Sequence, residues 1–249
     1  MEGTERQEGE SLRLTAPVKG ILRALATVIV ALSLVSFVGE TFTEFVITDN
    51  KYLDRIVEWL DVNAEGSVPT WYATITLMAC SLLAFVIAVD AMRRRRPYRS
   101  HWAAIAVAFA LLSLEEILGI HSEATRVLRE FVSISDPGPY ALALGAIAIF
   151  GLALVVLVFG RFYLHLPARW RTWFMVGVVI YAAGVIGTDA VGDYLMSETG
   201  GTTLAFMAAV TIEEFLEMTG VLIFIVLLLD YVQTFVGPVS FEVTQPVGP

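Results

Sequence analysis

Charged residues are scarce in this 249-residue chain, and so are cysteine and histidine. Only 16% of the residues are charged whereas 57% are hydrophobic, which is too apolar for an ordinary soluble domain. The single cysteine, Cys80, excludes a disulfide framework. The sequence contains no His-Glu-x-x-His, Gly-x-Ser-x-Gly or P-loop motif, so nothing in it indicates the enzymes that use them.

The three histidines are badly placed for a shared site. His101 and His165 flank expected membrane spans on one side, whereas His121 follows a span on the other side. This separation argues against a three-histidine zinc site and a bis-histidine haem. A retinal Schiff base lacks its lysine, because no lysine falls in the interior of an expected span.

Long hydrophobic runs are what the chain does contain. Six of them approach or exceed the length of about 20 apolar residues that a bilayer crossing needs. They predict an all-α fold, a polytopic six-helix transmembrane bundle over residues 20–235. No Ala-x-Ala site follows the first run, so we expect it to remain as an uncleaved anchor. The expected spans are Gly20–Gly39, Thr70–Met92, Trp102–Ile120, Tyr140–Gly160, Thr172–Met196 and Leu204–Tyr231.

Basic residues are segregated between the spans. Twelve of the sixteen Lys and Arg lie before or in the first turn of the first span, between spans two and three, or between spans four and five. The positive-inside rule places those segments, and both termini, in the cytoplasm. The Arg93–Arg96 run is interpreted as a topology signal beside a span, so no nucleic acid partner is expected. Asp90 is expected to form a solvated ion pair with Arg93 or Arg94, one turn away.

The segments outside the spans have simpler predictions. Residues 1–19 are polar and residues 236–249 are rich in Pro and Gly, so both are expected to be disordered cytoplasmic tails. Residues 51–63 have apolar side chains at helical spacing and an acidic opposite face. They predict a short outer-surface helix, and the acidic face favours a cap on the bundle over adhesion to anionic lipid.

Acidic residues inside the spans are the main functional signal. An ionised acid near the centre of a span costs about 2.5–3.5 kcal/mol on insertion scales, so such residues normally face a partner, water or the bundle interior. The basic residues stop at the span ends, so protons or a cation are the natural counter-charge. We therefore predict an ion or proton site formed by Glu115, Glu116, Asp189, Glu213, Glu214 and Glu217.

The acids occur in two similar stretches. Residues 113–120 read Ser-Leu-Glu-Glu-Ile-Leu-Gly-Ile and residues 211–218 read Thr-Ile-Glu-Glu-Phe-Leu-Glu-Met. One interpretation is a 3+3 inverted repeat of the kind that places substrate sites in transporters; the other is chance among apolar helices. Both stretches also match a capping box, which would break the helices inside the membrane. No glycine or proline closely precedes either one, so continuous helices are favoured.

Three functions remain open at this level. The favoured one is a transporter-like or ion-linked protein that binds protons or a cation. The second is a membrane-embedded di-metal oxidoreductase, with a divalent metal as cofactor and Glu116, His121, Glu214 and Glu217 as ligands. His121 follows Glu116 by five residues where that centre needs three, which counts against it. The third is a structural or assembly subunit whose acids hold the helices together.

The same motifs resemble a family of uncharacterised bacterial multi-pass membrane proteins. The similarity is carried by Ser113-Leu-Glu115-Glu116, by Ile120-His121 and by residues 213–220, which read Glu-Glu-Phe-Leu-Glu-Met-Thr-Gly. The chain departs from the family pattern at Glu115, where the family has Asp, and at Ser122, where it has Glu. The resemblance implies a shared acidic site in a bacterial inner membrane and brings no activity with it.

Overall fold

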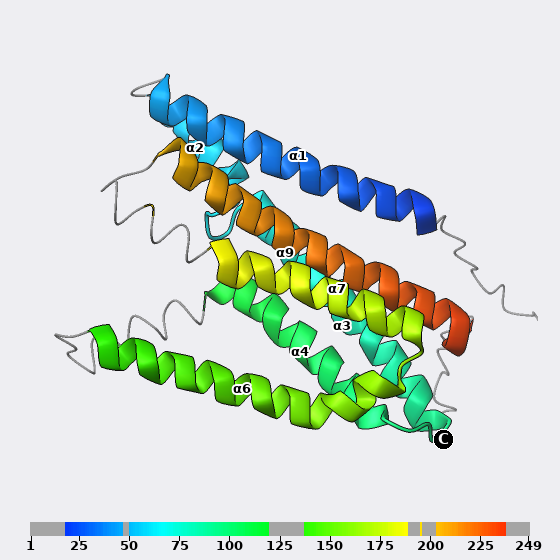
Figure 1. The fold of residues 1–249 in the computed structure, drawn as a ribbon. Coiled ribbons are helices and arrows are strands. Elements are labelled where there is room, and N and C mark those ends of the chain that lie inside the picture. The colour runs from blue at the N-terminus through cyan, green and yellow to red at the C-terminus, as the bar shows by residue number, and fades with distance from the viewer. Residues whose placement is uncertain (1–17, 47–49, 120–136, 189–194, 196–202, 238–249) are drawn as a thin grey trace, which may run out of the picture.

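The computed structural model describes residues 18–46, 50–119, 137–188, 195 and 203–237, and these are helical apart from short connections (Figure 1). The described part of the chain contains seven α-helices and two π-helical turns, η1 and η2, and no strand. The all-α prediction is confirmed. The elements are α1 Val18–Phe45, α2 Lys51–Leu60, α3 Val68–Arg93, α4 Arg99–Leu118, α6 Pro137–His165, α7 Ala168–Ala182, η1 Ala183–Thr188, α9 Leu204–Tyr231 and η2 Val232–Val236.

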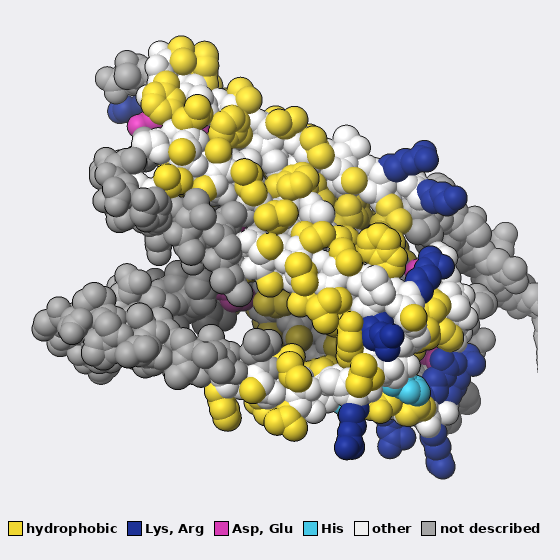
Figure 2. Space-filling model, in the orientation of Figure 1, with side chains coloured by type: hydrophobic (Ala, Val, Ile, Leu, Met, Phe, Trp, Pro, Cys, Tyr) yellow, Lys and Arg dark blue, Asp and Glu magenta, His cyan; other side chains and the backbone are white. Residues whose placement is uncertain are grey.

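Four helices, namely α1, α3, α4 and α9 with η2, are long and apolar enough to cross a membrane. At about 1.5 Å per residue, the 28 residues of α9 measure roughly 42 Å, more than the ~30 Å hydrocarbon core of a bilayer. Large apolar side chains cover the outside of the bundle (Figure 2). A surface of this kind is stable against lipid, so the chain is a multi-pass membrane protein in contact with the bilayer.

The predicted fourth and fifth spans correspond to α6 and to α7 with η1. In Figure 1, α7 lies beside α9, and α6 lies at the edge of the bundle. In α7 the α-helix ends at Ala182 and continues as the π-helical turn η1, which the hydrophobic pattern did not predict.

The first helix is longer than the predicted span, because the stretch Glu40–Glu44 is helical instead of a loop. Its hydroxyls bond within the helix: Thr41 Oγ1 donates to the carbonyl of Phe37 at 2.7 Å and Thr43 Oγ1 to that of Gly39 at 3.1 Å. A hydroxyl group that donates to the carbonyl one turn earlier has its hydrogen bond within the helix. These polar residues therefore do not require the helix to end. The helix therefore extends past the expected span, as far as Phe45.

The core lies where α3 packs against α4 and α9. Cys80 and Ala84 of α3 are fully buried there. Polar side chains in this region bond across helices: Ser81 Oγ donates to the carbonyl of Ala106 at 2.8 Å, and the Cys80 thiol lies 3.8 Å from the carbonyl of Val221. Such contacts are favourable where no water competes.

The short helix α2 confirms the predicted amphipathic helix, although it ends at Leu60. Asn50 caps its N-terminus by accepting hydrogen bonds from the amides of Tyr52 and Leu53. The helix packs on α1, where a side chain at Gly39 would meet Val57 at 3.3 Å. None of its residues is fully buried, so α2 lies on the bundle surface.

Most of the described Lys and Arg gather where α1, α4 and α7 begin and α3, α6 and α9 end (Figures 1 and 2). We call this the basic end. It agrees with the predicted charge segregation between connecting segments. Its basic residues are Lys19, Arg23, Arg93, Arg94, Arg95, Arg96, Arg99, Arg161, Arg169 and Arg171.

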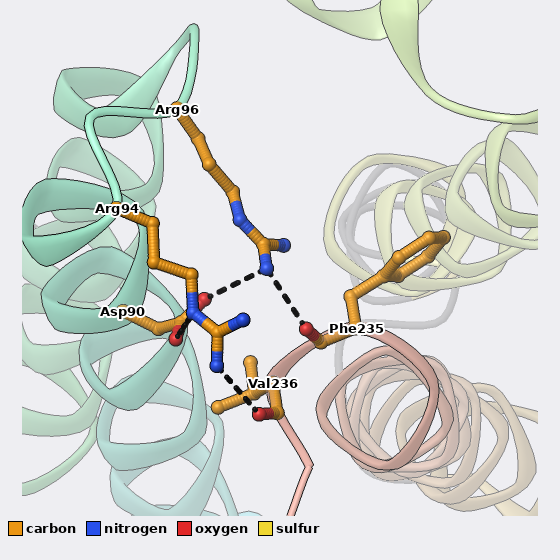
Figure 3. Close-up of polar contacts among 5 residues, drawn as sticks. All are labelled: Asp90, Arg94, Arg96, Phe235 and Val236. Atoms are coloured by element: carbon orange, nitrogen blue, oxygen red, sulfur yellow. Dashed lines mark hydrogen bonds and ion pairs between the residues drawn. The ribbon is translucent and has the colours of Figure 1, made fainter.

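Asp90 occupies the centre of a clamp at the basic end (Figure 3). Its carboxylate is paired with Arg94 at 2.7 Å and with Arg96 at 3.4 Å, and only 13% of its side chain is exposed. The same two arginines donate to the carbonyls of Val236, at 3.4 Å, and Phe235, at 3.0 Å. The predicted pairing with Arg94 is confirmed, and the Arg94 side chain is 56% exposed. The sequence did not predict that the two arginines also join the end of α3 to the end of η2.

Candidate functional site

As predicted, α4 is continuous through Glu115 and Glu116 as far as Leu118, and α9 is continuous through residues 211–218. In α4 the hydroxyl of Ser113 donates across the bundle to the carbonyl of Thr74 at 3.0 Å, and in α9 that of Thr211 donates to Met207 at 2.8 Å. Neither hydroxyl caps a helix. The end of α4 comes instead at Gly119, whose φ of +52° is the left-handed conformation that commonly closes a helix.

Three of the predicted site residues line one small cavity. Glu116 of α4 and Glu214 and Glu217 of α9 meet there, and Tyr181 of α7 joins them. The cavity has a volume of about 10 Å³, which is near the lower limit for one water molecule. Its remaining lining is apolar and comes from α3 and α9: Ala73, Leu77, Met218 and Val221.

Tyr181 brings a hydroxyl to these acids. Its phenol is close enough to Glu217 to act on the carboxylate as a hydrogen-bond partner. It is also within electrostatic range of Glu116 and Glu214. Because a phenol can both donate and accept, it can serve a carboxylate in either protonation state.

The other two glutamates of the motifs lie beside the cavity. Glu115 acts electrostatically on Glu116, and Glu213 acts on Glu214 and Glu217. Neither lines the cavity itself. The pairs at 115–116 and 213–214 therefore divide into one inward member and one flanking member, as expected for adjacent positions on a helix.

Two glycines bring α7 and α9 together at this place. A methyl group at Gly184 of η1 would lie 2.8 Å from Cγ of Glu217 and 2.9 Å from the carbonyl oxygen of Glu213. At Gly220 of α9 it would lie 2.8 Å from Cβ of Tyr181 and 2.9 Å from its amide nitrogen. Small residues let membrane helices approach closely.

The π-helical turn η1 coincides with that contact. The turn is formed by Ala183–Thr188 and begins two residues after Tyr181, and Gly184 is buried within it. π-Helical turns occur often at functional sites, because they alter which side chains a helix presents to its neighbours. Here the turn follows the residue that faces the glutamates.

Two further acids extend from the cavity toward the surface by α2. Asp61, just after α2, acts electrostatically on Glu214 and interacts with Glu40 of α1. Glu40 also accepts a 2.7 Å hydrogen bond from Ser36 Oγ, which in turn accepts one of 3.0 Å from the amide of Val62. Acidic groups thus run from the α2 surface to the cavity.

Sequence reasoning had missed Tyr181, Glu40 and Asp61. Glu40 and Asp61 were seen only as loop and surface acids, and nothing in their spacing indicates the approach of α1 and α2 to α9. Two predicted site residues, Asp189 and His121, lie outside the described residues. Within the described ranges, no three His, Cys, Asp or Glu side chains are grouped so that they could hold a metal ion.

Comparison with known proteins identifies a family but no function. A family model described as a domain of unknown function (DUF8692) matches residues 22–232. No curated protein and no solved structure shows significant similarity to the chain. Because the match extends over most of the chain, the protein belongs to this family.

Proposed function

We propose that this member of the DUF8692 family is an ion-linked, transporter-like membrane protein whose acidic cavity binds protons or a cation. In this proposal residues 20–235 form six spans, with α6 and α7 as the fourth and fifth. Residues 1–19 and 236–249 are tails on the cytoplasmic side of a bacterial inner membrane, and α2 lies on the outer side.

One observation carries the proposal: Glu116, Glu214 and Glu217 line a single cavity inside an apolar bundle. Among the residues that the structure describes, no Lys, Arg or His lines it. Several acids in a medium of low dielectric require positive charge, and here protons or a bound cation are the available sources. The small cavity suits a proton, a water molecule or a bare ion better than an organic substrate.

The position of the cavity favours transport over a purely structural role. Glu116 is near the end of α4 away from the basic end, and Asp61 and Glu40 lead from there to the surface near α2. A structural ion-pair network would place basic side chains in the cavity lining, and none of the described lining residues is basic.

Proton flux through proteoliposomes tests the proposal. The chain is reconstituted with a pH-sensitive dye inside, and a sodium, potassium or pH gradient is imposed. We expect Glu214→Gln to lower the flux at least tenfold while the thermal unfolding temperature stays within a few degrees of wild type. Glu58→Gln, which removes the same charge from the exposed face of α2, should leave the flux unchanged.

Several results would overturn the proposal. Wild-type flux no greater than that of empty liposomes, under all three gradients, would remove the transport assignment. Equal flux in wild type and Glu214→Gln would remove the cavity from the pathway. If the variant lost both its fold and its flux, a structural role of the acids in holding the helices together would replace the transport proposal. Elemental mass spectrometry on the same samples would show a metal centre as stoichiometric iron, manganese or zinc that is lost in the variant.

A further inference from the structure

A surface groove between α7 and α9 lies at the basic end, away from the acidic cavity. It has a volume of about 380 Å³ and is lined mainly by apolar side chains. Trp173 of α7 and Val226 of α9 are 51% and 41% exposed, so this side of the groove is open. Ile223 and Leu227 complete its apolar wall. A groove with this lining, on the lipid-facing side of a bundle, suits a hydrocarbon chain.

The end of the groove nearest the basic end is polar. Arg169, in the first turn of α7, lies there with its side chain 69% exposed. Its guanidinium is 3.6 Å from Asp230 of α9 and 5.9 Å from the ring centre of Trp170. A guanidinium has five N–H donors in a planar fork, so a single long contact with Asp230 leaves donors that can reach a phosphate.

Two further features favour an anion at this position. The N-cap of α7 is Pro167, which provides no side-chain cap, so the first amides of the helix point toward the same end as Arg169. Among the described residues, the basic end has ten Lys and Arg and two acidic residues, Asp90 and Asp230, so its net charge is strongly positive. Asp230 repels an anion locally, but it also holds the guanidinium at the mouth of the groove.

We propose that this groove binds one anionic phospholipid, with an acyl chain along Trp173, Val226 and their neighbours and the phosphate on Arg169. Basic pockets between membrane helices are a recurrent way of recognising such headgroups. Tryptophans at this level suit the boundary between headgroups and hydrocarbon. The site is independent of the proposed ion-linked function.

Native mass spectrometry of the detergent-solubilised full chain, titrated with phosphatidylglycerol or phosphatidylcholine of the same acyl chains, tests the proposal. We expect phosphatidylglycerol to bind about fivefold more tightly, in proportion to one basic residue at a membrane surface. Arg169→Gln should remove the preference. Arg99→Gln, which neutralises another first-turn arginine at the basic end, should retain it.

A second pair of variants tests the groove itself. Val226→Trp fills it and should weaken both lipids, whereas Val179→Trp changes an exposed apolar residue of α7 outside the groove and should weaken neither. Both sites are exposed, so the variants should fold. The proposal is refuted by equal wild-type affinity for the two lipids, or by equal losses in Arg169→Gln and Arg99→Gln. It is also refuted if inorganic phosphate competes as strongly as the lipid, because the acyl groove would then contribute nothing.

Discussion

Gly184→Ala is the most direct test of how the site is built. The added methyl group would lie 2.8 Å from Cγ of Glu217 and 2.9 Å from the carbonyl oxygen of Glu213. One neighbour is backbone and the other is close to the α9 main chain, so neither can move aside without shifting the helix. Overpacking of this kind costs about 1–3 kcal/mol. For a chain of this size that corresponds to roughly 2–12 °C in the unfolding temperature.

Gly160→Ala is the matched control. It makes the same chemical change inside α6, where a methyl group would find nothing within 4 Å. Alanine favours a helix over glycine by about 1 kcal/mol, so this variant should be neutral or slightly more stable.

The assay can use the protein's own thiol. Cys80 is fully buried, so a maleimide dye that fluoresces on reaction should report unfolding as detergent-solubilised protein is heated. The reasoning is refuted if Gly184→Ala and Gly160→Ala unfold at the same temperature. A lower unfolding temperature for Gly184→Ala, together with weaker proton flux, would connect the helix contact to the cavity.

Three further outcomes follow from contacts elsewhere in the bundle. Arg96→Ala should lower the free energy of unfolding by about 1 kcal/mol, because the contacts with the Asp90 carboxylate and the Phe235 carbonyl are lost. Arg93→Ala should have no measurable effect in the same thermal assay. Ser113→Ala should lower the free energy of unfolding by about 0.6 kcal/mol, the average for hydrogen bonds between membrane helices, because the carbonyl of Thr74 loses its hydroxyl donor. An unchanged unfolding temperature would contradict this expectation. Cys80 should react with maleimide only after denaturant is added, and rapid labelling of folded protein would show that α3 is not packed as described.

The sequence was sufficient to predict the helices but not how they meet. Runs of apolar residues predicted α3 and α9 closely, because a bilayer allows few alternatives to a continuous helix. The acids inside the apolar runs likewise indicated that Glu116, Glu214 and Glu217 face the bundle interior, because an acid is costly in hydrocarbon, and these three residues line one cavity. These predictions depend only on local pattern and solvent.

The remaining features depend on contacts between distant parts of the chain. Tyr181 is an ordinary aromatic residue in the sequence, and only the close approach at Gly184 and Gly220 brings it to the glutamates. Asp61 reaches Glu214 because the connection after α2 folds over the bundle. The π-helical turn η1 has no periodic signature, because it depends on what packs against it.

The clamp formed by Arg94 and Arg96 has a consequence for biogenesis. Arg94 and its partner Val236 are 142 residues apart, so at about 5–20 residues per second the ribosome takes roughly 7–28 s to make the second after the first. The helical hairpin of α3 and α4 is therefore complete long before its clamp and its core partner α9 exist. In that interval the polar groups that face α9, among them the Cys80 thiol and the Glu116 carboxyl group, are exposed to lipid or to the insertion machinery. Nascent chains arrested before Phe235 should therefore remain bound to that machinery and be degraded faster than the full-length protein.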